Sequence, residues 1–127
     1  MWLTLCKSKI HRAAVTEANL DYVGSITIAR DLMDAAGIVP HERVQVLNVR
    51  SGARLETYVI PGDPGSGVIC LNGPAAHHFT PGDLAVIIAY AQFTTEEARD
   101  WHPQVVFVDA QNRVARVSRE ERPFTTE

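Results

Sequence analysis

Residues 44–60 read VQVLNVRSGARLETYVI, two runs rich in apolar and β-branched residues on either side of the turn pair Ser51-Gly52. Runs of this kind predict two strands, over Val44–Val49 and Arg54–Ile60, joined by a short turn. The stretch therefore indicates a chain built mainly from β-strands.

Similar short runs recur outward from this stretch in both directions. They predict further strands over Leu3–Cys6, Ile10–Val15, Ser25–Ala29, Gly67–Leu71, Leu84–Ala91, Val105–Val108 and Val114–Val117. Many short strands separated by Gly, Pro and Asn turns favour a closed barrel or a sandwich. Because side chains fill a small barrel, a substrate pocket has to lie on its outer surface or between subunits.

A few helical turns interrupt the strands. One helix is expected over Asp31–Ala36, with Asp31 as its N-cap and Gly37 as its stop signal. The threonine and acidic residues at the start of Thr95–Arg99 indicate a second helix. A single turn is expected over Pro74–His77, and the polar tail from Ser118 is expected to fray.

Composition bounds the class of protein. The chain has 127 residues and a net charge of -3, which fits one domain with no general attraction to nucleic acid or to anionic membranes. The longest apolar run, Leu84–Ala91, is too short to cross a bilayer. The N-terminal segment has no signal-peptide core, so a cytoplasmic protein is expected. Cys6 and Cys70 are interpreted as buried thiols, because a disulfide is unusual in a reducing compartment.

Several common kinds of site are not indicated. The five histidines form no H-E-x-x-H motif, and the two cysteines form no C-x-x-C motif, so no metal site is expected. The glycine-rich run from Gly62 to Gly67 precedes a strand rather than a helix, which does not suit phosphate binding. A serine hydrolase would need a G-x-S-x-G elbow, and the chain has none.

The pair Gly24-Ser25, at the head of an apolar strand, allows an unusual reaction. If the Ser25 hydroxyl attacks the carbonyl carbon of Gly24, the peptide bond becomes an ester. This step loses amide resonance and needs a strained or well-positioned backbone. Glycine at the preceding position tolerates the unusual angles. The alternative is a plain turn leading into a strand, as for most Gly-Ser pairs.

Cations follow the alternation of the strands. Lys9 and His11 are two residues apart, so an extended backbone carries them on one face, and Arg54, Glu56 and Tyr58 share a face in the same way. Lys9, His11 and Arg54 together would form a cationic pocket that attracts a small dicarboxylate. Arginine suits bidentate carboxylate binding. The alternative for each residue is a solvated strand face.

Over nearly the whole chain the sequence resembles the aspartate 1-decarboxylase family. The resemblance is carried by several spaced motifs, among them Lys9-Ile10-His11-Arg12, Tyr22-Val23-Gly24-Ser25-Ile26, Leu32–Ile38, Thr57-Tyr58, Asn72-Gly73, Ala75-Ala76-His77 and Glu96–Arg99. It implies a double-psi β-barrel with a few short helices, assembled as a homotetramer with active sites between subunits. It also implies conversion of L-aspartate to β-alanine and CO2 for pantothenate and coenzyme A synthesis.

The resemblance further implies a covalent pyruvoyl cofactor made from Ser25. Self-cleavage would divide the single domain, 1–127, into chains 1–24 and 25–127, with Gly24 as the new C-terminus. The pyruvoyl ketone would form a Schiff base with the substrate and accept the electrons released with CO2. The remaining site positions implied are Tyr58 as proton donor, Arg54 and Lys9 as carboxylate binders, Thr57, Gly73, Pro74 and Ala75 as the substrate-binding surface, Thr57 and Asn72 in self-processing, and His11 and Tyr22 lining the pocket.

Two features complicate this assignment. Pro74 stands where the family often has alanine, and proline lacks a backbone N–H, so the amides of Gly73 and Ala75 or Ala76 would have to serve. Thr57 and Tyr58 are consecutive, so a regular strand would send them to opposite faces. Both reach one pocket only near a strand end, at a bulge or across a subunit interface. A non-catalytic barrel and a related decarboxylase, such as one acting on glutamate, remain alternatives.

Overall fold

The chain is mainly β with three short helices, as predicted. The structure, a computed structural model, describes residues 1–126. Its strands are β1 (Trp2–Ala14), β2 (Glu17–Asn19), β3 (Ile26–Ala29), β4 (Arg43–Asn48), β5 (Arg54–Gly62), β6 (Ile69–Asn72), β7 (Leu84–Thr94), β8 (Gln104–Val108) and β9 (Val114–Ser118). The helices are α1 (Arg30–Ala36), the 3₁₀ helix η1 (Gly73–His78) and α2 (Thr95–Arg99).

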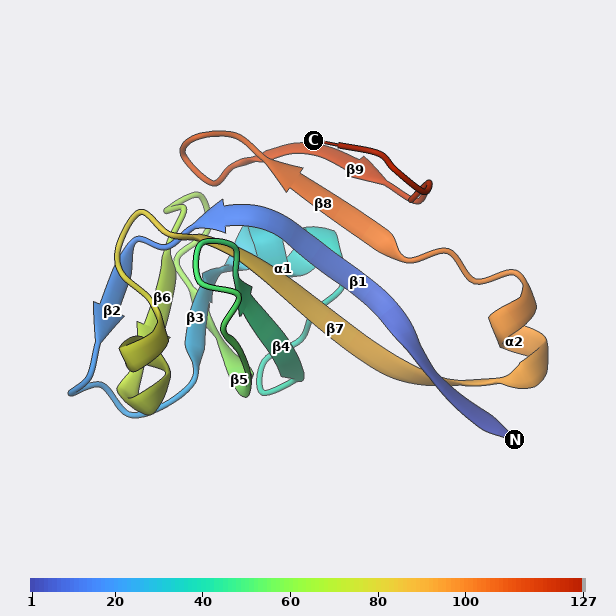
Figure 1. Cartoon of the computed structure of the whole chain (residues 1–127), viewed down its shortest axis with the longest axis horizontal. Helices are drawn as coiled ribbons and strands as arrows, with labels where there is room; N and C mark the ends of the chain where they lie inside the picture. Colours follow the sequence, from blue (N-terminus) through green and yellow to red (C-terminus); the bar gives the residue numbers. More distant parts are fainter. Residues whose placement is uncertain (127) are drawn as a thin grey trace.

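The strands close into a barrel because β1 and β2 follow one another in sequence but lie far apart in the strand order of the sheet (Figure 1). The strand order is β2-β6-β3-β5-β4-β7-β1-β8-β9. β1 pairs with β7 and β2 pairs with β6, yet β2 begins only a few residues after β1 ends. Between them the amide of Val15 donates to the carbonyl oxygen of Asp83 (2.8 Å) and that of Thr16 to the carbonyl oxygen of Ile69 (2.8 Å). The barrel is thus continuous across this junction.

The pairing pattern agrees with the double-psi barrel that the resemblance implies. Two parallel pairs, β2 with β6 and β3 with β5, flank the antiparallel pair of β3 and β6. Crossing connections interlock these strands, because β3 and β6 are neighbours although β4 and β5 lie between them in sequence. Ser25 and Asn72 flank the β3–β6 pair at one end of the barrel.

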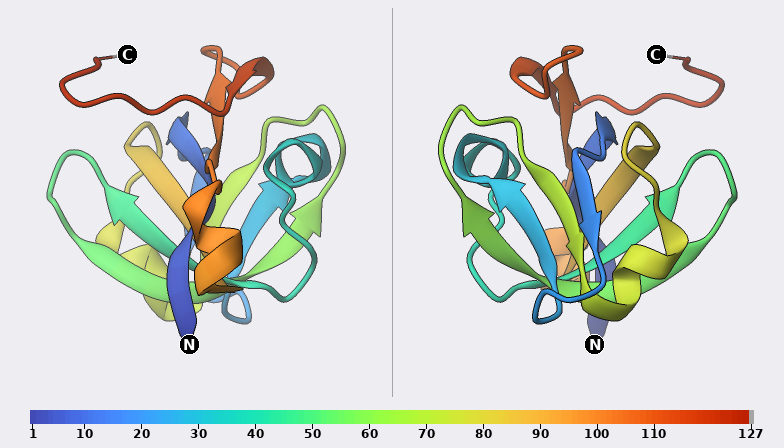
Figure 2. Two further views of the ribbon diagram at one scale, coloured as in Figure 1. Left: turned by 90° about the vertical axis from the view of Figure 1, so that its right-hand side faces the viewer. Right: turned by 90° about the vertical axis from the view of Figure 1, so that its left-hand side faces the viewer.

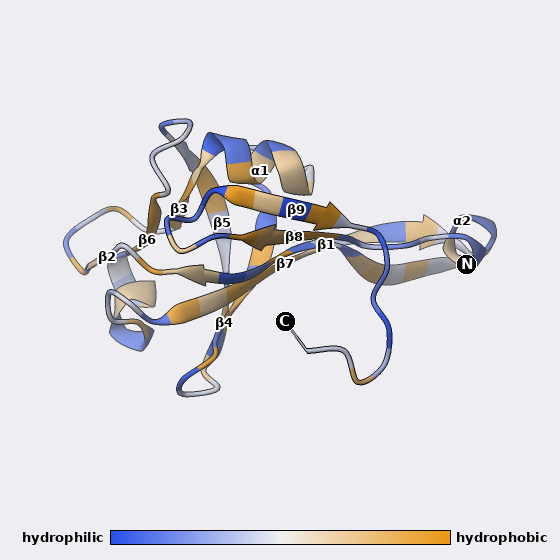
Figure 3. Cartoon of the chain, turned by 90° about the horizontal axis from the view of Figure 1, so that it is seen from above, coloured by the Kyte–Doolittle hydropathy of each residue, from blue (hydrophilic) through white to orange (hydrophobic). Residues whose placement is uncertain are grey.

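The apolar side chains fill the barrel interior. Fully buried residues alternate along the strands, for example Val44 and Val46 in β4, and α1 contributes Leu32 and Met33 to the same core. Figure 3 shows hydrophobic residues along β7 and β8, whereas the segment that follows β9 begins with a hydrophilic run. Because side chains pack the interior of a small barrel closely, a site is expected at the barrel surface.

A two-stranded arm extends away from the barrel (Figure 1). It is formed by Trp2–Cys6 of β1 paired with Tyr90–Thr94 of β7, and α2 follows at its tip. Phe93 and Trp101 pack there with ring centroids 4.6 Å apart. The two strands predicted over Leu3–Cys6 and Ile10–Val15 are therefore one long strand with bulges, because β7 is long enough to pair with both.

The ends of the helices differ from the predictions in detail. Asp31 is not the N-cap of α1: it lies in the first turn, and its carboxylate accepts a hydrogen bond from the Gly65 amide (2.8 Å). Gly37 ends the helix in the left-handed conformation, as predicted. α2 spans Thr95–Arg99, as predicted, and the residue before it, Thr94, forms a capping box with Glu97.

The C-terminal segment leaves the sheet after β9 and runs back along the molecule (Figure 2). Residues 119–126 lie outside any helix or strand, as expected for a polar tail. The segment nevertheless contacts the sheet, because Glu121 forms an ion pair with Lys9 of β1 and Arg119 donates a hydrogen bond to Gln104 Oε1 of β8 (2.9 Å).

Candidate functional site

Ser25 has an unusual backbone conformation for a residue that carries a side chain. Its φ angle is +79°, in the left-handed region, and only 3% of its surface is exposed. A serine held in this region costs roughly 1–3 kcal/mol of backbone strain. β3 begins only at Ile26, so Ser25 lies outside the regular strand that was predicted to include it. The strain falls at the peptide that the sequence marks for cleavage.

Asn72 holds Ser25 through both its side chain and its backbone. The Asn72 side-chain amide donates to Ser25 Oγ (3.2 Å) and to Thr27 Oγ1 (3.1 Å). The backbone N–H of Asn72 donates to the carbonyl oxygen of Ser25 (3.0 Å). Because Ser25 Oγ accepts from the amide, its own proton is left to point toward another acceptor.

Gly24 is enclosed by a glycine and a tyrosine. A Cβ added at Gly73 would lie 3.1 Å from the carbonyl oxygen of Tyr22 and 3.2 Å from the amide nitrogen of Gly24. Gly73 also has a φ of +62°, so both its conformation and its surroundings require glycine. A Cβ added at Gly24 would lie 3.5 Å from the Tyr58 hydroxyl. The backbone at the candidate cleavage point thus has a phenol beside it.

These residues border an open cavity of about 340 Å³. It is lined by Gly24, Ser25, Leu55, Glu56, Thr57, Tyr58, Asn72, Pro74, Ala75 and His78. Most of the predicted site residues are among them, and Gly73 adjoins through its contact with Gly24. Three lining residues were not predicted: Leu55, Glu56 and His78. Glu56 lies two residues before Tyr58 on the same strand, and this spacing could have indicated that it belongs to the site. No local sequence pattern marks Leu55 or His78.

Both Thr57 and Tyr58 line the cavity, although they are consecutive in β5. The reason is that β5 pairs with β3 only from Val59 onward, where it faces Ile26. Along Arg54–Tyr58, β5 pairs with β4 on one side alone. The other edge is open to the cavity, which therefore reaches side chains from both faces. Thr57 and Tyr58 lie in the interior of β5, so their shared access comes from the missing neighbour strand and not from an end of β5 itself.

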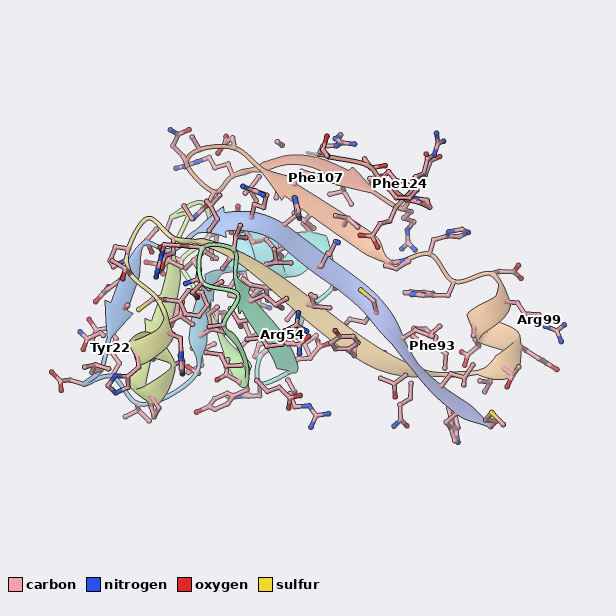
Figure 4. All side chains as sticks on the ribbon, viewed as in Figure 1. Tyr22, Arg54, Phe93, Arg99, Phe107 and Phe124 are labelled. Carbon is pink, nitrogen blue, oxygen red and sulfur yellow. The ribbon has the colours of Figure 1, made fainter. Side chains whose placement is uncertain are left out.

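Four predicted site residues do not line this cavity in the single chain. Arg54 is exposed and lies beside β4 and β5, and Tyr22 lies at the β2 end of the molecule (Figure 4). Lys9 and His11 border a separate cavity of about 90 Å³ beneath the C-terminal segment. There Lys9 pairs with Glu121, and the His11 ring packs edge-on against Phe107. Lys9 and His11 share a face, as predicted, but one chain does not bring Arg54 to them.

Acidic and polar neighbours surround Tyr22 and Cys70. A hydrogen bond to Glu17 and the charge of that carboxylate raise the pKa of Tyr22. Burial, reinforced by Glu17, raises the pKa of the Cys70 thiol. Both groups therefore keep their protons at neutral pH. The interpretation of Cys70 as a buried free thiol is confirmed, whereas Cys6 is only half-buried.

A polar network anchors the helix η1 at the side of the cavity. Asn48 Nδ2 donates to the carbonyl oxygen of His78 (2.9 Å) and to Asp83 Oδ2 (2.9 Å). Arg50 binds the same carboxylate through two hydrogen bonds, of 2.8 and 2.9 Å. These bonds, those from Arg50 foremost, hold the pKa of Asp83 well below its usual range. The network fixes the end of η1 that carries His78.

Metal chemistry has no evident location in the part of the chain that the structure describes. Within residues 1–126 no group of three or more His, Cys, Asp or Glu side chains is arranged to hold an ion. The side chains that line the cavity supply the strained serine, the Tyr58 phenol and the Asn72 amide. They also supply the Thr57 hydroxyl, the Glu56 carboxylate and the His78 imidazole.

Comparisons with known proteins point to one family. Residues 1–115 match the family model described as aspartate decarboxylase. A protein of Carboxydothermus hydrogenoformans named aspartate 1-decarboxylase is 57% identical over 127 residues, covering 100% of both chains. Its namesake from Acetivibrio thermocellus is 59% identical over 122 residues, covering 96% of this chain and 97% of that protein. Among solved structures, the computationally designed msDPBB_sym2 protein aligns with a TM-score of 0.43 at 14% identity, covering 70% of this chain and 99% of that one.

Proposed function

Because the chain belongs to the aspartate decarboxylase family, we propose that it converts L-aspartate to β-alanine and CO2 and so supplies pantothenate and coenzyme A synthesis. The observation that carries this proposal is the state of Ser25: buried, held at a φ of +79° and hydrogen-bonded to Asn72. Backbone strain of this kind gathers at functional sites, and here it coincides with burial and with a hydrogen bond to the side-chain oxygen.

The first reaction is on the chain itself. Ser25 Oγ attacks the carbonyl carbon of Gly24, the bond from that carbon to the Ser25 nitrogen breaks, and an ester forms with a free amine. Loss of the Ser25 Cα proton then expels Gly24 as a carboxylate and leaves a dehydroalanine. One water hydrolyses this group to a pyruvoyl group, and one ammonia leaves. The single domain, 1–127, becomes chains 1–24 and 25–127.

The geometry supports this reaction in three ways. Strain at Ser25 raises the energy of the peptide that has to break, which offsets part of the lost amide resonance. Burial removes water that would otherwise solvate the hydroxyl and compete with it as a nucleophile. Asn72 orients the attacking oxygen through the hydrogen bond from its side-chain amide to Ser25 Oγ.

In the mature enzyme, the pyruvoyl group supplies a carbonyl that accepts the electrons released as CO2 leaves. The residues of the chain bind the substrate and move a proton. Tyr58, whose hydroxyl lies beside Gly24, donates a proton to the substrate α-carbon. Thr57 and the turn Gly73-Pro74-Ala75 orient the substrate, with the Gly73 and Ala75 amides as donors because Pro74 has none.

Substrate charge supports a site shared between subunits. Aspartate carries two carboxylates, yet the cavity beside Ser25 is lined by no lysine or arginine of the described chain. Lys9 and His11 lie in a different cavity, and Arg54 stands exposed beside the site. We propose a homotetramer in which Arg54 and, from a neighbouring copy, Lys9 bind the carboxylates, with His11 and Tyr22 bordering the completed pocket.

The expected setting is the cytoplasm. Among residues 1–126 no helix is long and apolar enough to cross a membrane. The partners proposed are L-aspartate and other copies of the chain.

Mass spectrometry of the purified chain tests the first reaction. Two fragments are expected after incubation, and their summed mass should equal that of the chain plus one water minus one ammonia. Ordinary hydrolysis would add one water and lose no ammonia. Ser25→Ala should stay uncut. A chain that stays whole, or fragments that retain the ammonia, would contradict the proposal.

Release of CO2 and β-alanine from L-aspartate tests the second reaction. The cut enzyme should act on aspartate, and glutamate should be a poor substrate. Activity on glutamate alone would assign a related decarboxylase instead.

A further inference from the structure

Four side chains form one cluster across β3 and β6. Ser25 and Thr27 are two residues apart on one segment, and Cys70 and Asn72 are two residues apart on the other. In the antiparallel register Thr27 faces Cys70. Because side chains two apart on a strand share a face, the thiol and the hydroxyls all meet the Asn72 amide.

Both the nitrogen and the oxygen of the Asn72 side-chain amide form hydrogen bonds within this cluster. Its nitrogen donates to the hydroxyls of Ser25 and Thr27. Its oxygen accepts from Cys70 Sγ at 3.1 Å. Cys70 and Asn72 are both buried, with exposed fractions of 3% and 4%, and the bond between them is buried as well, so it is worth more than a solvent-exposed bond of the same kind.

The thiol is suited to donate because it keeps its proton. Burial is the main cause of its raised pKa, and the carboxylate of Glu17, which faces Cys70 across the β2–β6 pair, adds to it. A protonated thiol has one S–H donor, and the Asn72 oxygen is the side-chain acceptor in its reach.

The amide has a second orientation that would oppose the self-cleavage. If it turned over, its oxygen would face the two hydroxyls and accept their protons. The Ser25 hydroxyl would then hold its proton on Asn72 rather than release it to a base during attack. The Cys70 thiol favours the first orientation, in which its S–H donates to the Asn72 oxygen. In the turned orientation the S–H would face the NH₂ group and would lose its acceptor.

We propose that Cys70 is a positioning residue for the self-cleavage, whose thiol holds the Asn72 amide in the orientation that donates to Ser25 Oγ. The inference rests on the proposed function, because it concerns the rate of the cut at Ser25. It assigns Cys70 no contact with the substrate.

Three variants separate this role from simple packing. Cys70→Ser keeps a donor but is less apolar, Cys70→Val fills the volume without a donor, and Cys70→Ala removes both. If the donor matters, Cys70→Ser should cut at close to the normal rate, whereas Cys70→Val and Cys70→Ala should be roughly 3- to 10-fold slower. Thermal stability, measured on each variant combined with Ser25→Ala, should instead rank Cys70→Val above Cys70→Ser.

The expected order of cutting rates for Cys70→Ser and Cys70→Val is the reverse of their expected order of thermal stability, so the cutting rates distinguish hydrogen bonding from packing. If Cys70→Val cuts as fast as Cys70→Ser or faster, packing accounts for the residue and the inference is wrong. If the unmutated chain never cuts, the proposed function fails first.

A second measurement does not depend on cleavage. In a Ser25→Ala, Cys6→Ala background only one thiol remains, and its infrared S–H stretch should lie at the lower frequency of a hydrogen-bonded thiol. Adding Asn72→Ala should move the stretch to higher frequency. An unchanged stretch would overturn the inference even if the cleavage rates followed the expected order.

Discussion

Asn72 donates two hydrogen bonds to Ser25: its side-chain amide nitrogen lies 3.2 Å from Ser25 Oγ, and its backbone nitrogen lies 3.0 Å from the Ser25 carbonyl oxygen. The two residues are 47 positions apart in sequence. This double contact holds the strained serine at the end of the β3–β6 pair. The first prediction concerns this contact.

Asn72→Ala should slow self-cleavage by about 10- to 100-fold, because it removes the donor that orients Ser25 Oγ. Thr27→Val is the matched control, since it removes only the other acceptor of the same amide. It should cut at close to the normal rate. Time courses of fragment formation on gels or by mass spectrometry measure both. Equal slowing in the two variants would show that the cluster acts only through stability.

Strain at Ser25 predicts an unusual order of stability. Ser25→Gly and Ser25→Ala should both stay uncut, and the glycine variant should be more stable by about 1 kcal/mol, because glycine adopts a φ of this sign without cost. Ser66 serves as the control, because its φ is not positive. There the alanine variant should be at least as stable as the glycine variant. Urea unfolding measures both pairs, and the same order at both positions would refute strain at Ser25.

Gly73 and Gly52 offer a matched pair of left-handed glycines. Their φ angles are +62° and +76°, but a Cβ would crowd Gly24 at the first position and meet nothing within 4 Å at the second. Each alanine variant should lose about 1 kcal/mol of stability from its backbone conformation. Only Gly73→Ala should also slow self-cleavage, because the new methyl displaces Gly24. Normal cutting by Gly73→Ala would show that the close approach has no role.

The chain has two lysines, which makes a direct test of the shared site possible. Lys9→Gln should raise the KM for aspartate about 10- to 100-fold through loss of a charged contact. Lys7→Gln should leave the KM unchanged, because Lys7 is bound to Glu42 and to the carbonyl oxygen of Gly37. Steady-state kinetics on fully cut enzyme measure both.

Mixed assemblies identify which copy supplies the lysine. Lys9→Gln and Ser25→Ala chains, produced together, should regain low-KM activity at sites that draw Lys9 from one copy and Ser25 from the other. Neither variant alone should show it. If Lys9 serves the site of its own chain, mixing restores nothing.

Asp83 predicts a dependence of stability on pH. Its pKa is lowered in the folded chain, chiefly by the hydrogen bonds from Arg50. The stabilisation is therefore fully present above the unfolded value of about 3.9 and is lost as the pH falls toward the folded value. In an uncut Ser25→Ala background, Asp83→Asn should lower the melting temperature at about pH 7 and have a moderately smaller effect at about pH 3, because the folded-state pKa lies well below that pH and much of the stabilisation is still present there. An equal effect at both pH values would contradict an ionic role.

Much of the fold could be predicted from local patterns. The alternation in β4 and β5 and the glycine stop after α1 depend on neighbours within a few residues, so propensity and turn chemistry were sufficient. β2 was missed because a strand of three residues carries too little periodicity to register. The error at Asp31 has a similar origin: its carboxylate is used by Gly65, a residue 34 positions away.

The residues of the candidate site also divide into those that the local sequence indicates and those that only the fold brings together. Gly24-Ser25 stood out because the chemistry of a serine following a glycine is local. The positive φ of Ser25 and the lining residue His78 depend on contacts between β3, β6 and η1, and no local pattern encodes them.

By itself, the sequence determined which chemical groups are available and which short segments extend or coil, because backbone preferences and side-chain alternation act over a few residues. Only the tertiary structure decided which groups meet. The start of β3 opposite Val59 opens the edge of β5 to both Thr57 and Tyr58, the β3–β6 register brings Asn72 to Ser25, and the path of β1 carries Lys9 to another cavity. These outcomes follow from strand order and register, which are set by burying the whole core at once rather than by any one segment.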